Sequence, residues 1–502
     1  MQDHRCRGAR WHENKSENCD RRGRCGWLGD VIRRHGATRR HLRPLTLFDP
    51  SFRREYRSAR GYPYRADPTE PLLNAPARMM SVRPDDEADF TRWLDRTRSL
   101  TSATNTYVSR PTFGSYLRDS LSELRRIWDS RDGLLHCVPE EVVVIAETAA
   151  GRYRLETSGA LYRDYDHVIL CVGWRTDDLS HSEGGVRAYP LAPAVERGAG
   201  CKHVGIIGTG LTSIDVVRGL LLRGFDGKIT AASRRGLLPS ARNEVSSLTP
   251  ELYTRSALSR RDGLDLRESM ALIEAEAHHH AVDLSVPKSL LRGDRSRSMH
   301  IEYLNSGLHD GWSDLFVKLC DEVACDSWNL FDATSRRIFR QVIHPYFQAW
   351  CNPMPPVTAR LVRDAIESGQ LEVRAGLEGF NEREMRFSDG DIRRPQLIVN
   401  ASRGGSDSIG STRTPLLSSM LNDGYAVPDA FGGVQVEYGT WEVLSATGRS
   451  QRLYAVGSLT QGARYYVSAL DSIVRAVREV AHAIEQRRGE QPVALQSSIA
   501  GS

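Results

Sequence analysis

The 502-residue sequence predicts an α/β fold built on parallel strands, and three observations lead to this prediction. A short apolar run at 203–207 enters a Gly-x-Gly turn and continues into a segment with helical periodicity that ends at Gly224. Two further strand-like runs lie at 45–50, which ends in an acidic residue, and at 453–457, which ends at a glycine turn. The length allows two or three domains, and the composition, 40% hydrophobic and 26% charged, is ordinary for a soluble globular protein.

The turn after residue 207 has the features of a phosphate-binding turn. Gly208 can make the sharp bend, Gly210 lets the backbone approach a pyrophosphate, and the third position, Ser213, is small. An anion would rest on free amides at the start of the helix. The candidate binding residues of this turn are Gly208, Thr209, Gly210, Leu211, Thr212 and Ser213. A glycine turn in an α/β core without a ligand is the alternative.

The next strand, at 227–232, ends in Ser233, Arg234 and Arg235, where an NAD site usually places an acidic residue. Two arginines suit the 2′-phosphate of NADPH. A charged hydrogen bond favours NADPH over NADH by roughly ten- to hundred-fold, so one well-placed arginine is sufficient for a clear preference. A solvated basic turn is the alternative.

The positive charge of the chain is concentrated at its amino end. Residues 1–44 contain twelve Lys/Arg and five Asp/Glu, a surplus of seven, so the net charge of +5 leaves −2 for the other 458 residues. The body of the protein is therefore not basic, and we expect no nucleic-acid partner. Residues 1–44 also lack a periodic apolar pattern, which is explained either by a disordered basic tail or by a start-site or reading-frame error.

The strand at 45–50 sharpens this question. Asp49 lies near the end of this strand. In a dinucleotide fold, the second strand also ends in an acidic residue, which binds the ribose hydroxyl. Such a strand requires a first strand and a glycine turn about 20 residues upstream. The glycines there, Gly23, Gly26 and Gly29, follow no strand pattern.

The remaining elements follow in order along the chain. The segments 72–81 and 107–119 read as an extended loop and a loop that feeds a helix. A β-hairpin is predicted at 141–157 and a strand at 166–173. The strand at 453–457 meets a glycine turn, and a loop then leads into the last helix. The tail from residue 486 is polar and is expected to be disordered.

The segment at about 250–353 is charged and mostly helical, and it is not required by a two-domain scheme. It contains His278, His279 and His280, which suggest a metal site. Consecutive histidines on a helix point in different directions, and the sequence pairs no carboxylate or cysteine with them. A solvated helical stretch is therefore favoured, and no metal is predicted.

Two function classes are disfavoured by composition. No run approaches eighteen apolar residues and no signal peptide opens the chain, so we expect a cytoplasmic protein without membrane association. The nine cysteines include no Cys-x-x-Cys, which argues against a dithiol redox pair and a zinc framework.

Taken together, the motifs resemble the FAD/NAD(P)-binding flavoproteins related to class B flavin monooxygenases. The resemblance extends from about residue 45 to 484 and rests on the order Phe48-Asp49-Pro50, Leu73 to Met79, Arg110 to Tyr116, Cys171-Val172-Gly173, Gly208 to Thr212 and Ser233 to Pro239. It implies two Rossmann-like domains: an FAD domain at 45–175 and 404–485, and an inserted NADPH domain at 176–403 that carries the helical insertion.

The resemblance also implies the cofactor contacts and the activity. It assigns to FAD the residues Asp49, Asn74, Arg78, Arg110, Gly173, Gly457 and Ser468. The implied reaction is an NADPH-dependent monooxygenation of a small molecule, an amine or amino acid, by molecular oxygen. Arg464, Tyr465 and Tyr466 are candidates for the flavin edge, but no residue is identified as an acid or base. The alternatives are a flavin reductase that passes electrons onward, and a non-catalytic nucleotide-binding remnant that lacks the FAD glycine turn.

Overall fold

The computed structural model describes residues 45–48, 61–98, 105–130, 135–148, 151–172, 185–243, 248–402, 414–447, 452–467 and 469–487. The amino-terminal segment 1–44 and the tail 488–502 lie outside this set, as do the predicted FAD contacts Asp49, Gly173 and Ser468.

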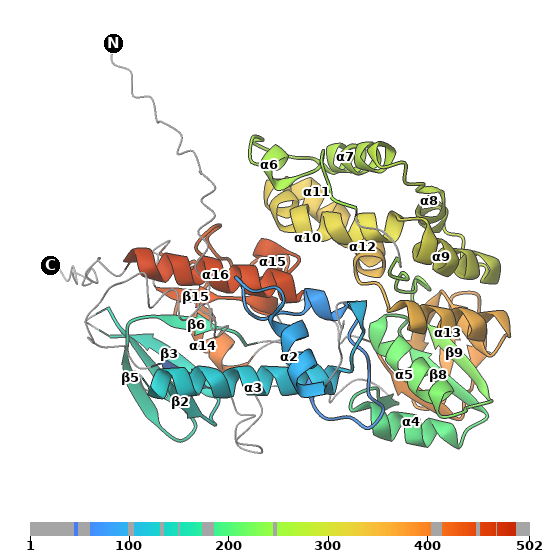
Figure 1. The fold of residues 1–502 in the computed structure, drawn as a ribbon, viewed down its shortest axis with the longest axis horizontal. Helices are drawn as coiled ribbons and strands as arrows, with labels where there is room; N and C mark the ends of the chain where they lie inside the picture. The colour runs from blue at the N-terminus through green and yellow to red at the C-terminus, as the bar shows by residue number, and fades with distance from the viewer. Residues whose placement is uncertain are drawn as a thin grey trace, which may run out of the picture.

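A five-stranded parallel sheet forms the centre of one half of the molecule (Figure 1). Its strands, in spatial order, are β10 (Leu371–Arg374), β9 (Lys228–Ala232), β8 (His203–Ile207), β14 (Leu397–Asn400) and β7 (Val186–Arg187). The strands β9, β8 and β14 in the middle of the sheet are buried, because both faces of the sheet are covered. Their largely apolar and small side chains are typical of such buried parallel strands. The helices α4 (Leu191–Ala199), α5 (Leu211–Leu222) and α13 (Pro356–Glu367) pack around the sheet. The predicted strand, turn and helix at 203–224 are confirmed.

The other half is assembled from two distant segments of the chain, 45–172 and 414–487. Short parallel pairs join β1 (Leu45–Phe48) to β2 (Leu135–Val138) and β6 (Val168–Leu170) to β15 (Leu453–Ala455). The predicted hairpin is confirmed, and a third strand extends it into the antiparallel sheet β3 (Val142–Glu147), β4 (Tyr153–Thr157) and β5 (Leu161–Tyr165). The helices of this half are α3 (Arg110–Asp129), α14 (Pro415–Asn422) and α16 (Leu470–Gln486).

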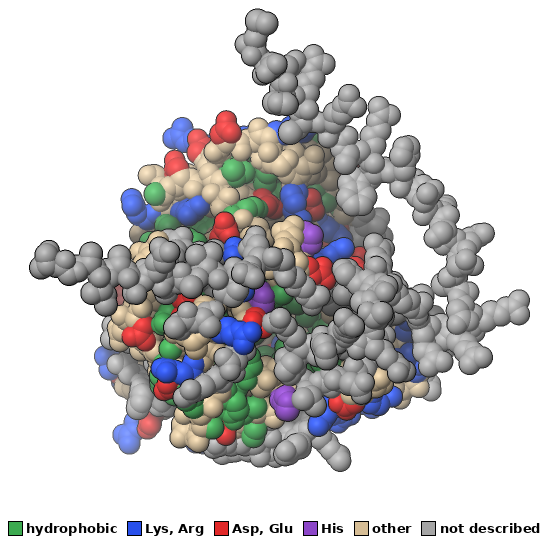
Figure 2. Space-filling view, turned by 90° about the vertical axis from the view of Figure 1, so that its left-hand side faces the viewer, with side chains coloured by type: hydrophobic (Ala, Val, Ile, Leu, Met, Phe, Trp, Pro, Cys, Tyr) green, Lys and Arg blue, Asp and Glu red, His purple; other side chains and the backbone are tan. Residues whose placement is uncertain are grey.

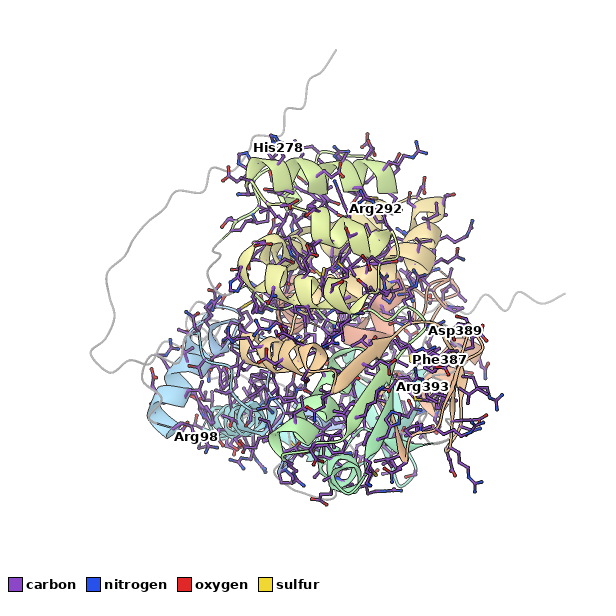
Figure 3. The ribbon with its side chains drawn as sticks, turned by 90° about the vertical axis from the view of Figure 1, so that its right-hand side faces the viewer. Arg98, His278, Arg292, Phe387, Asp389 and Arg393 are labelled. Atoms are coloured by element: carbon purple, nitrogen blue, oxygen red, sulfur yellow. The ribbon has the colours of Figure 1, made fainter. Side chains whose placement is uncertain are left out.

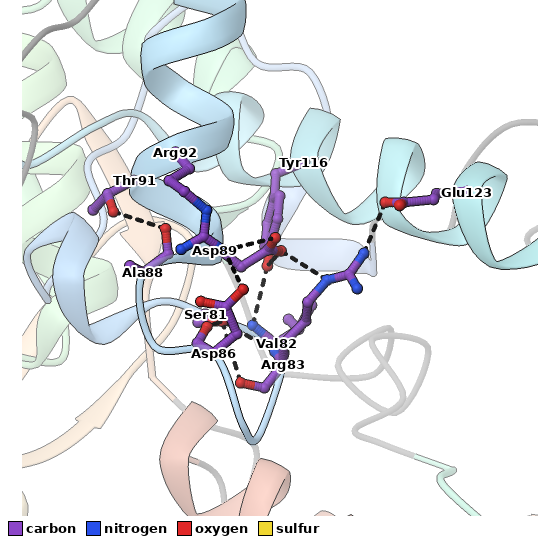
Figure 4. Close-up of polar contacts among 10 residues, drawn as sticks. All are labelled: Ser81, Val82, Arg83, Asp86, Ala88, Asp89, Thr91, Arg92, Tyr116 and Glu123. Atoms are coloured by element: carbon purple, nitrogen blue, oxygen red, sulfur yellow. Dashed lines mark hydrogen bonds and ion pairs between the residues drawn. The ribbon is translucent and has the colours of Figure 1, made fainter. Parts of the chain in front are cut away.

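The loop at 61–88 is fixed to α3 through aromatic packing and a polar network. Phe90 and Trp93 of α2 (Asp89–Arg98) pack against Tyr116 of α3. The Tyr116 hydroxyl donates to Asp89 Oδ2 at 2.7 Å, and Arg83 bridges Asp89 and Glu123 at 3.0 and 2.7 Å (Figure 4). The short helices η2 (Tyr62–Tyr64) and η3 (Ala77–Met79) lie within this loop. Residues 71–80 are held in place by main-chain bonds, in which the amides of Leu73 and Ala77 donate to the carbonyls of Val108 and Thr106 at 2.9 Å each.

The predicted helical insertion is confirmed, and it forms a separate lobe at the upper right of Figure 1. It consists of α6 (Arg255–Leu258), α7 (Leu266–His279), α8 (Ser285–Leu291), α9 (Arg297–His309), α10 (Trp312–Leu330), α11 (Ala333–Ile338), the π-helical turn η6 (Phe339–Ile343) and α12 (His344–Cys351). The insertion is not an isolated module, because its buried core is continuous with that of the five-stranded sheet and includes Tyr465 and Tyr466.

A small antiparallel sheet joins β10 to β14: β11 (Leu377–Phe380), β12 (Met385–Phe387) and β13 (Ile392–Arg393). Arg374 of β10 holds its edge, since the guanidinium lies 4.1 Å from the Phe387 ring centre and donates to Asp389 at 2.7 Å. In Figure 3 the labelled residues Phe387, Asp389 and Arg393 lie on this sheet, well away from His278 on the insertion.

On the face drawn in Figure 2, Lys and Arg side chains are interspersed with Asp and Glu and form no continuous basic patch. This agrees with the charge count for the body of the chain. Within the described residues, none of the helices combines the length and the apolar character that crossing a membrane would demand.

Candidate functional site

The turn between β8 and α5 has the backbone geometry that a pyrophosphate requires. Gly208 adopts φ +102°, a region that L side chains rarely enter, and a Cβ there would lie 3.0 Å from the Ala401 carbonyl oxygen. Its amide donates to Ala232 at 2.7 Å, which fixes the turn against β9. A Cβ on Gly210 would meet no atom within 4 Å, so open space lies over this residue.

The position of this turn in the sheet is also that of a nucleotide site. β8 lies between β9 and β14, so the turn leaves the carboxyl ends of the strands where the chain order reverses. No side chain in the described structure caps the start of α5, which leaves its first amides available to an anion. Ser213 is fully buried one turn into the helix, where a larger side chain would separate helix and sheet.

Thr209 and Ser233 join the two turns that the sequence assigns to NADPH. The Thr209 hydroxyl donates to the Leu237 carbonyl at 2.6 Å and lies 2.9 Å from the Ser233 hydroxyl. Ser233 in turn accepts from the Gly236 amide at 2.9 Å. These hydroxyls therefore hold the turn after β9 against the turn after β8.

The structure separates the two predicted phosphate-binding arginines. Arg235 donates to the carbonyl of Gln341 at 2.8 Å and lies over the Tyr346 ring, so it anchors the insertion to the sheet. Arg234 is exposed, and although its main-chain carbonyl accepts from the Gly376 amide, its guanidinium has no partner among the residues that the structure describes. Of the two, Arg234 is the one free to bind a phosphate.

Among the predicted FAD contacts, Asn74, Arg78 and Gly457 lie at the surface of the other half. Arg78 is exposed and donates to Asn105, whereas Asn74 is half-buried in the loop at 71–80. Gly457 follows β15 with φ +80° and has open space where a Cβ would be, as a backbone that contacts a ligand needs.

Arg110, the fourth described FAD candidate, is committed to a buried ion pair instead of an open site. Its guanidinium lies 2.8 Å from Asp215 Oδ2 of α5, donates to the Leu72 carbonyl at 3.1 Å, and bonds the Tyr189 hydroxyl, which itself donates to Asp215. Burial raises the pKa of Asp215, and the charge of Arg110 opposes this rise. The pair ties α3 to α5. Sequence reasoning missed Asp215, although an acidic residue next to the apolar positions of this helix was an available signal.

The loop before α16 is buried and strained. Tyr465 adopts φ +61°, its hydroxyl lies 2.6 Å from His344 Nδ1, and its ring stacks on Trp328. Arg464 lies between the rings of Tyr438 and Trp441, 4.1 Å from each ring centre. Both side chains therefore have structural partners in the insertion or in the carboxy-terminal segment.

The expectation that the histidine run lacks paired carboxylates is wrong. His279 Nε2 lies 3.3 Å from Glu251, and His280 Nε2 lies 3.0 Å from the buried Glu276. Glu251 lies in the turn before α6, and Glu276 lies one turn before His280 in α7. The spacing of residues in the sequence could not reveal that Glu251 lies beside His279. One donor atom each from Glu251, His279 and His280 lies within 4.8 Å of the others, so these three residues could hold a divalent ion at the surface.

Comparison with known proteins identifies a nucleotide-binding region in the amino-terminal part of the chain. A family model described as FAD-NAD(P)-binding matches residues 30–175, which confirms the FAD/NAD(P)-binding resemblance over this range. No curated protein matches the chain.

Among solved structures, L-lysine 6-monooxygenase from Pseudomonas syringae is 14% identical, covering 88% of this chain and 99% of its own, with a TM-score of 0.49. A flavin-containing monooxygenase from Stenotrophomonas maltophilia is 13% identical, covering 88% and 98%, with a TM-score of 0.45. Ornithine hydroxylase from Pseudomonas aeruginosa is 12% identical, covering 89% and 99%, with a TM-score of 0.42.

Proposed function

We propose that this chain is an FAD- and NADPH-dependent oxidoreductase that acts as a monooxygenase on a small amine or amino acid. The observation that carries the proposal is the turn at Gly208, which leaves uncapped helix amides and an exposed Arg234 at the switch point of a parallel sheet. The family match at 30–175 supports a second dinucleotide-binding unit. The motif resemblance supports the oxygenase chemistry.

The domain scheme of this proposal is an NADPH domain at 176–403 inserted into an FAD domain at 45–175 and 404–485. All strands of the five-stranded sheet fall between residues 186 and 400, which supports these bounds. The pairing of β6 with β15 supports the discontinuous FAD domain, because it joins segments on both sides of the insertion.

The described residues fit the two cofactors to different degrees. For NADPH, the cradle at Gly208 and the exposed Arg234 are both present. For FAD, the open backbone at Gly457 and the half-buried Asn74 are present. The flavin, when bound, supplies the redox chemistry, and the protein supplies its orientation. In the overall reaction, NADPH, a proton, O₂ and an amine give NADP⁺, water and the hydroxylated amine.

Nucleotide titration tests the NADPH half of the proposal. The parent protein should bind NADPH more tightly than NADH. Arg234→Ala should reduce the affinity for NADPH about ten- to hundred-fold and leave that for NADH unchanged, because it removes one charged hydrogen bond to the 2′-phosphate. Arg235→Ala is the matched control and should change the preference less, since Arg235 bonds the insertion. Equal affinities in the parent would refute the assignment.

Product analysis tests the oxygenase half. With NADPH and a suitable amine, the amount of hydroxylated amine formed should match the NADPH consumed. Quantitative hydrogen peroxide with no hydroxylated product would instead identify a reductase. A protein that binds NADPH but purifies without flavin would identify the nucleotide-binding remnant.

A further inference from the structure

The carboxyl end of α7 brings two imidazole rings and a carboxylate together. The helix ends at His279, and His280 departs from helical backbone angles, with φ −93° and ψ 9°. The centres of the two rings lie 4.9 Å apart and the rings are nearly perpendicular, so the adjacent histidines lie side by side. His279 Nε2 lies 3.3 Å from the carboxylate of Glu251, which comes from the turn before α6. One donor atom from each of these three residues lies within 4.8 Å of the other two.

The carboxylate of Glu276 fixes two of the three residues. Glu276 is fully buried, and its Oε1 accepts from His280 Nε2 at 3.0 Å and from the Glu251 amide at 2.7 Å. Its Oε2 accepts from the amides of Leu252 and Tyr253 at 2.8 and 2.6 Å. When one ring nitrogen of a histidine donates to a carboxylate, the other is left free of a proton, which is how proteins orient a histidine that binds a metal. Glu276 therefore orients the His280 ring and holds the main chain of Glu251.

The spacing of the donor atoms fits a four-coordinate zinc ion. Zinc binds imidazole nitrogen at about 2.0–2.1 Å and carboxylate oxygen at about 2.0–2.2 Å with tetrahedral angles, so two such ligands lie about 3.3–3.5 Å apart. The distance between His279 Nε2 and the Glu251 carboxylate is 3.3 Å. The side chains of His279 and Glu251 are 43% and 63% exposed, which gives them room to close around an ion. Three protein ligands leave the fourth position to water.

The electrostatic surroundings also favour a cation. The carboxyl end of a helix carries a partial negative charge, and the cluster lies at that end of the 14-residue helix α7. Glu251 and Glu276 add two carboxylates. In the part of the chain that the structure describes, neither of them forms an ion pair with a lysine or arginine, so no fixed side-chain cation occupies the place of the metal.

We propose that Glu251, His279 and His280 form a zinc-binding site on the helical insertion. The ion would join the turn before α6 to the end of α7, and its binding would stabilise the folded insertion. Imidazole together with carboxylate suits zinc, whereas Mg²⁺ prefers a site made of oxygen ligands. The site goes beyond the proposed function, and nucleotide binding serves as an independent measurement.

Isothermal titration of the full-length, untagged protein with Zn²⁺ tests the site. His279→Gln and His280→Gln should each bind one equivalent of Zn²⁺ fewer than the parent, and a glutamine at position 280 can still donate to Glu276. Glu251→Gln should weaken this equivalent by at least the roughly ten-fold that loss of an outer partner costs. Other thiols and imidazoles of the chain are shared by the parent and all variants, so the difference between proteins reports this site alone.

His278→Gln is the matched control. His278 is an exposed neighbour on the same helix, labelled in Figure 3, and it lies outside the cluster. This variant should bind Zn²⁺ with the stoichiometry and affinity of the parent. Circular dichroism checks that each variant is folded.

Thermal denaturation provides a second measurement. Zn²⁺ should raise the melting temperature of the parent and of His278→Gln by the same amount, and that of His279→Gln by less, because an ion that binds only the folded state stabilises it. Mg²⁺ at the same concentration should produce no such difference.

Two results would overturn the inference. The first is Zn²⁺ binding in folded His279→Gln and His280→Gln that equals that of the parent. The second is an equal loss in His278→Gln, which would mean that the histidine run binds the ion without a defined site. NADPH affinity should be the same in the parent and all variants, so a failure of the nucleotide assignment would leave the zinc result standing.

Discussion

The molecule contains two strand–glycine–helix units that differ in how they are held. After β8, Gly208 at φ +102° leads into α5 within three residues, and β8 is paired on both sides by β9 and β14. After β15, Gly457 at φ +80° leads through the short helices η7 (Gly457–Thr460) and α15 (Gln461–Arg464) before α16 begins. Among the strands of the described structure, β6 alone pairs with β15, and an isolated bridge from Tyr454 to Glu442 holds its other side.

The second unit depends on contacts from the insertion. Trp328 of α10 donates to the Gly462 carbonyl at 2.7 Å, and His344 of α12 bonds Tyr465. The conformation of the first turn is set by residues of the turn and of its own sheet. The conformation of the second turn depends on residues more than a hundred positions away in the sequence. Substitutions in the first turn should therefore mainly weaken nucleotide binding, and substitutions in the second turn should mainly lower the stability of the whole protein.

The largest expected effect comes from the ion pair that joins the two halves. Arg110→Met leaves Asp215 buried without its cation, and we expect the free energy of unfolding to fall by about 3–5 kcal/mol. Urea denaturation measures the loss. Arg78→Met removes the same charge from an exposed position and should cost less than about 1 kcal/mol. Similar losses in the two variants would mean that the ion pair does not couple the halves.

Gly208→Ala tests the local character of the first turn. The new Cβ would lie 3.0 Å from the Ala401 oxygen in a backbone region unfavourable to alanine, so the turn must shift at a cost of about 2–3 kcal/mol. NADPH affinity, measured by fluorescence titration, should fall at least about ten-fold.

Gly224→Ala is the control for this change. Gly224 has φ +75° but open space around its Cβ position at the far end of α5, so it carries backbone strain alone. NADPH affinity equal to that of the parent is expected. If Gly208→Ala and Gly224→Ala lost NADPH affinity equally, the loss would come from general strain in α5 and not from the turn at Gly208.

Trp328→Phe tests the dependence of the second turn on the insertion. The change removes the indole N–H and leaves the Gly462 carbonyl without this donor, which should destabilise the protein by about 2 kcal/mol. NADPH affinity of the folded variant should stay within about two-fold of the parent, because the first turn makes no contact with this pair. If the Trp328→Phe variant were as stable as the parent but bound NADPH much more weakly, the second turn would not depend on the insertion in this way.

The smallest effect concerns the pH dependence of stability near α16. Asp321 has a folded-state pKa of about 7 against an ordinary value of 3.8, so in this window the folded protein binds more protons than the unfolded chain. Stability therefore falls as the pH rises from about 4 to 7. Asp321→Asn removes this loss and should gain about 1 kcal/mol on the parent between pH 5 and pH 8, allowing for solvent screening. A gain that is independent of pH would contradict the assignment.

The sequence predicted the strands, the turns and the helical insertion because these features have local causes. The alternation and periodicity at 142–157 and 203–222 describe which faces are apolar, and the structure has strands and helices there. It also predicted the turn at Gly208, since only a few residue types fit a left-handed backbone. The assignment of the individual cofactor contacts stays a prediction.

The tertiary structure alone decided which side chains remain free to act. Arg234 and Arg235 are equivalent in the sequence, but the carbonyls of η6 occupy only Arg235. The buried ion pair of Arg110 and Asp215 joins residues 105 positions apart, and no pattern in the chain marks them as neighbours. The physical reason is that periodicity records the faces of a segment, whereas partners of buried charges are set by packing between segments distant in sequence.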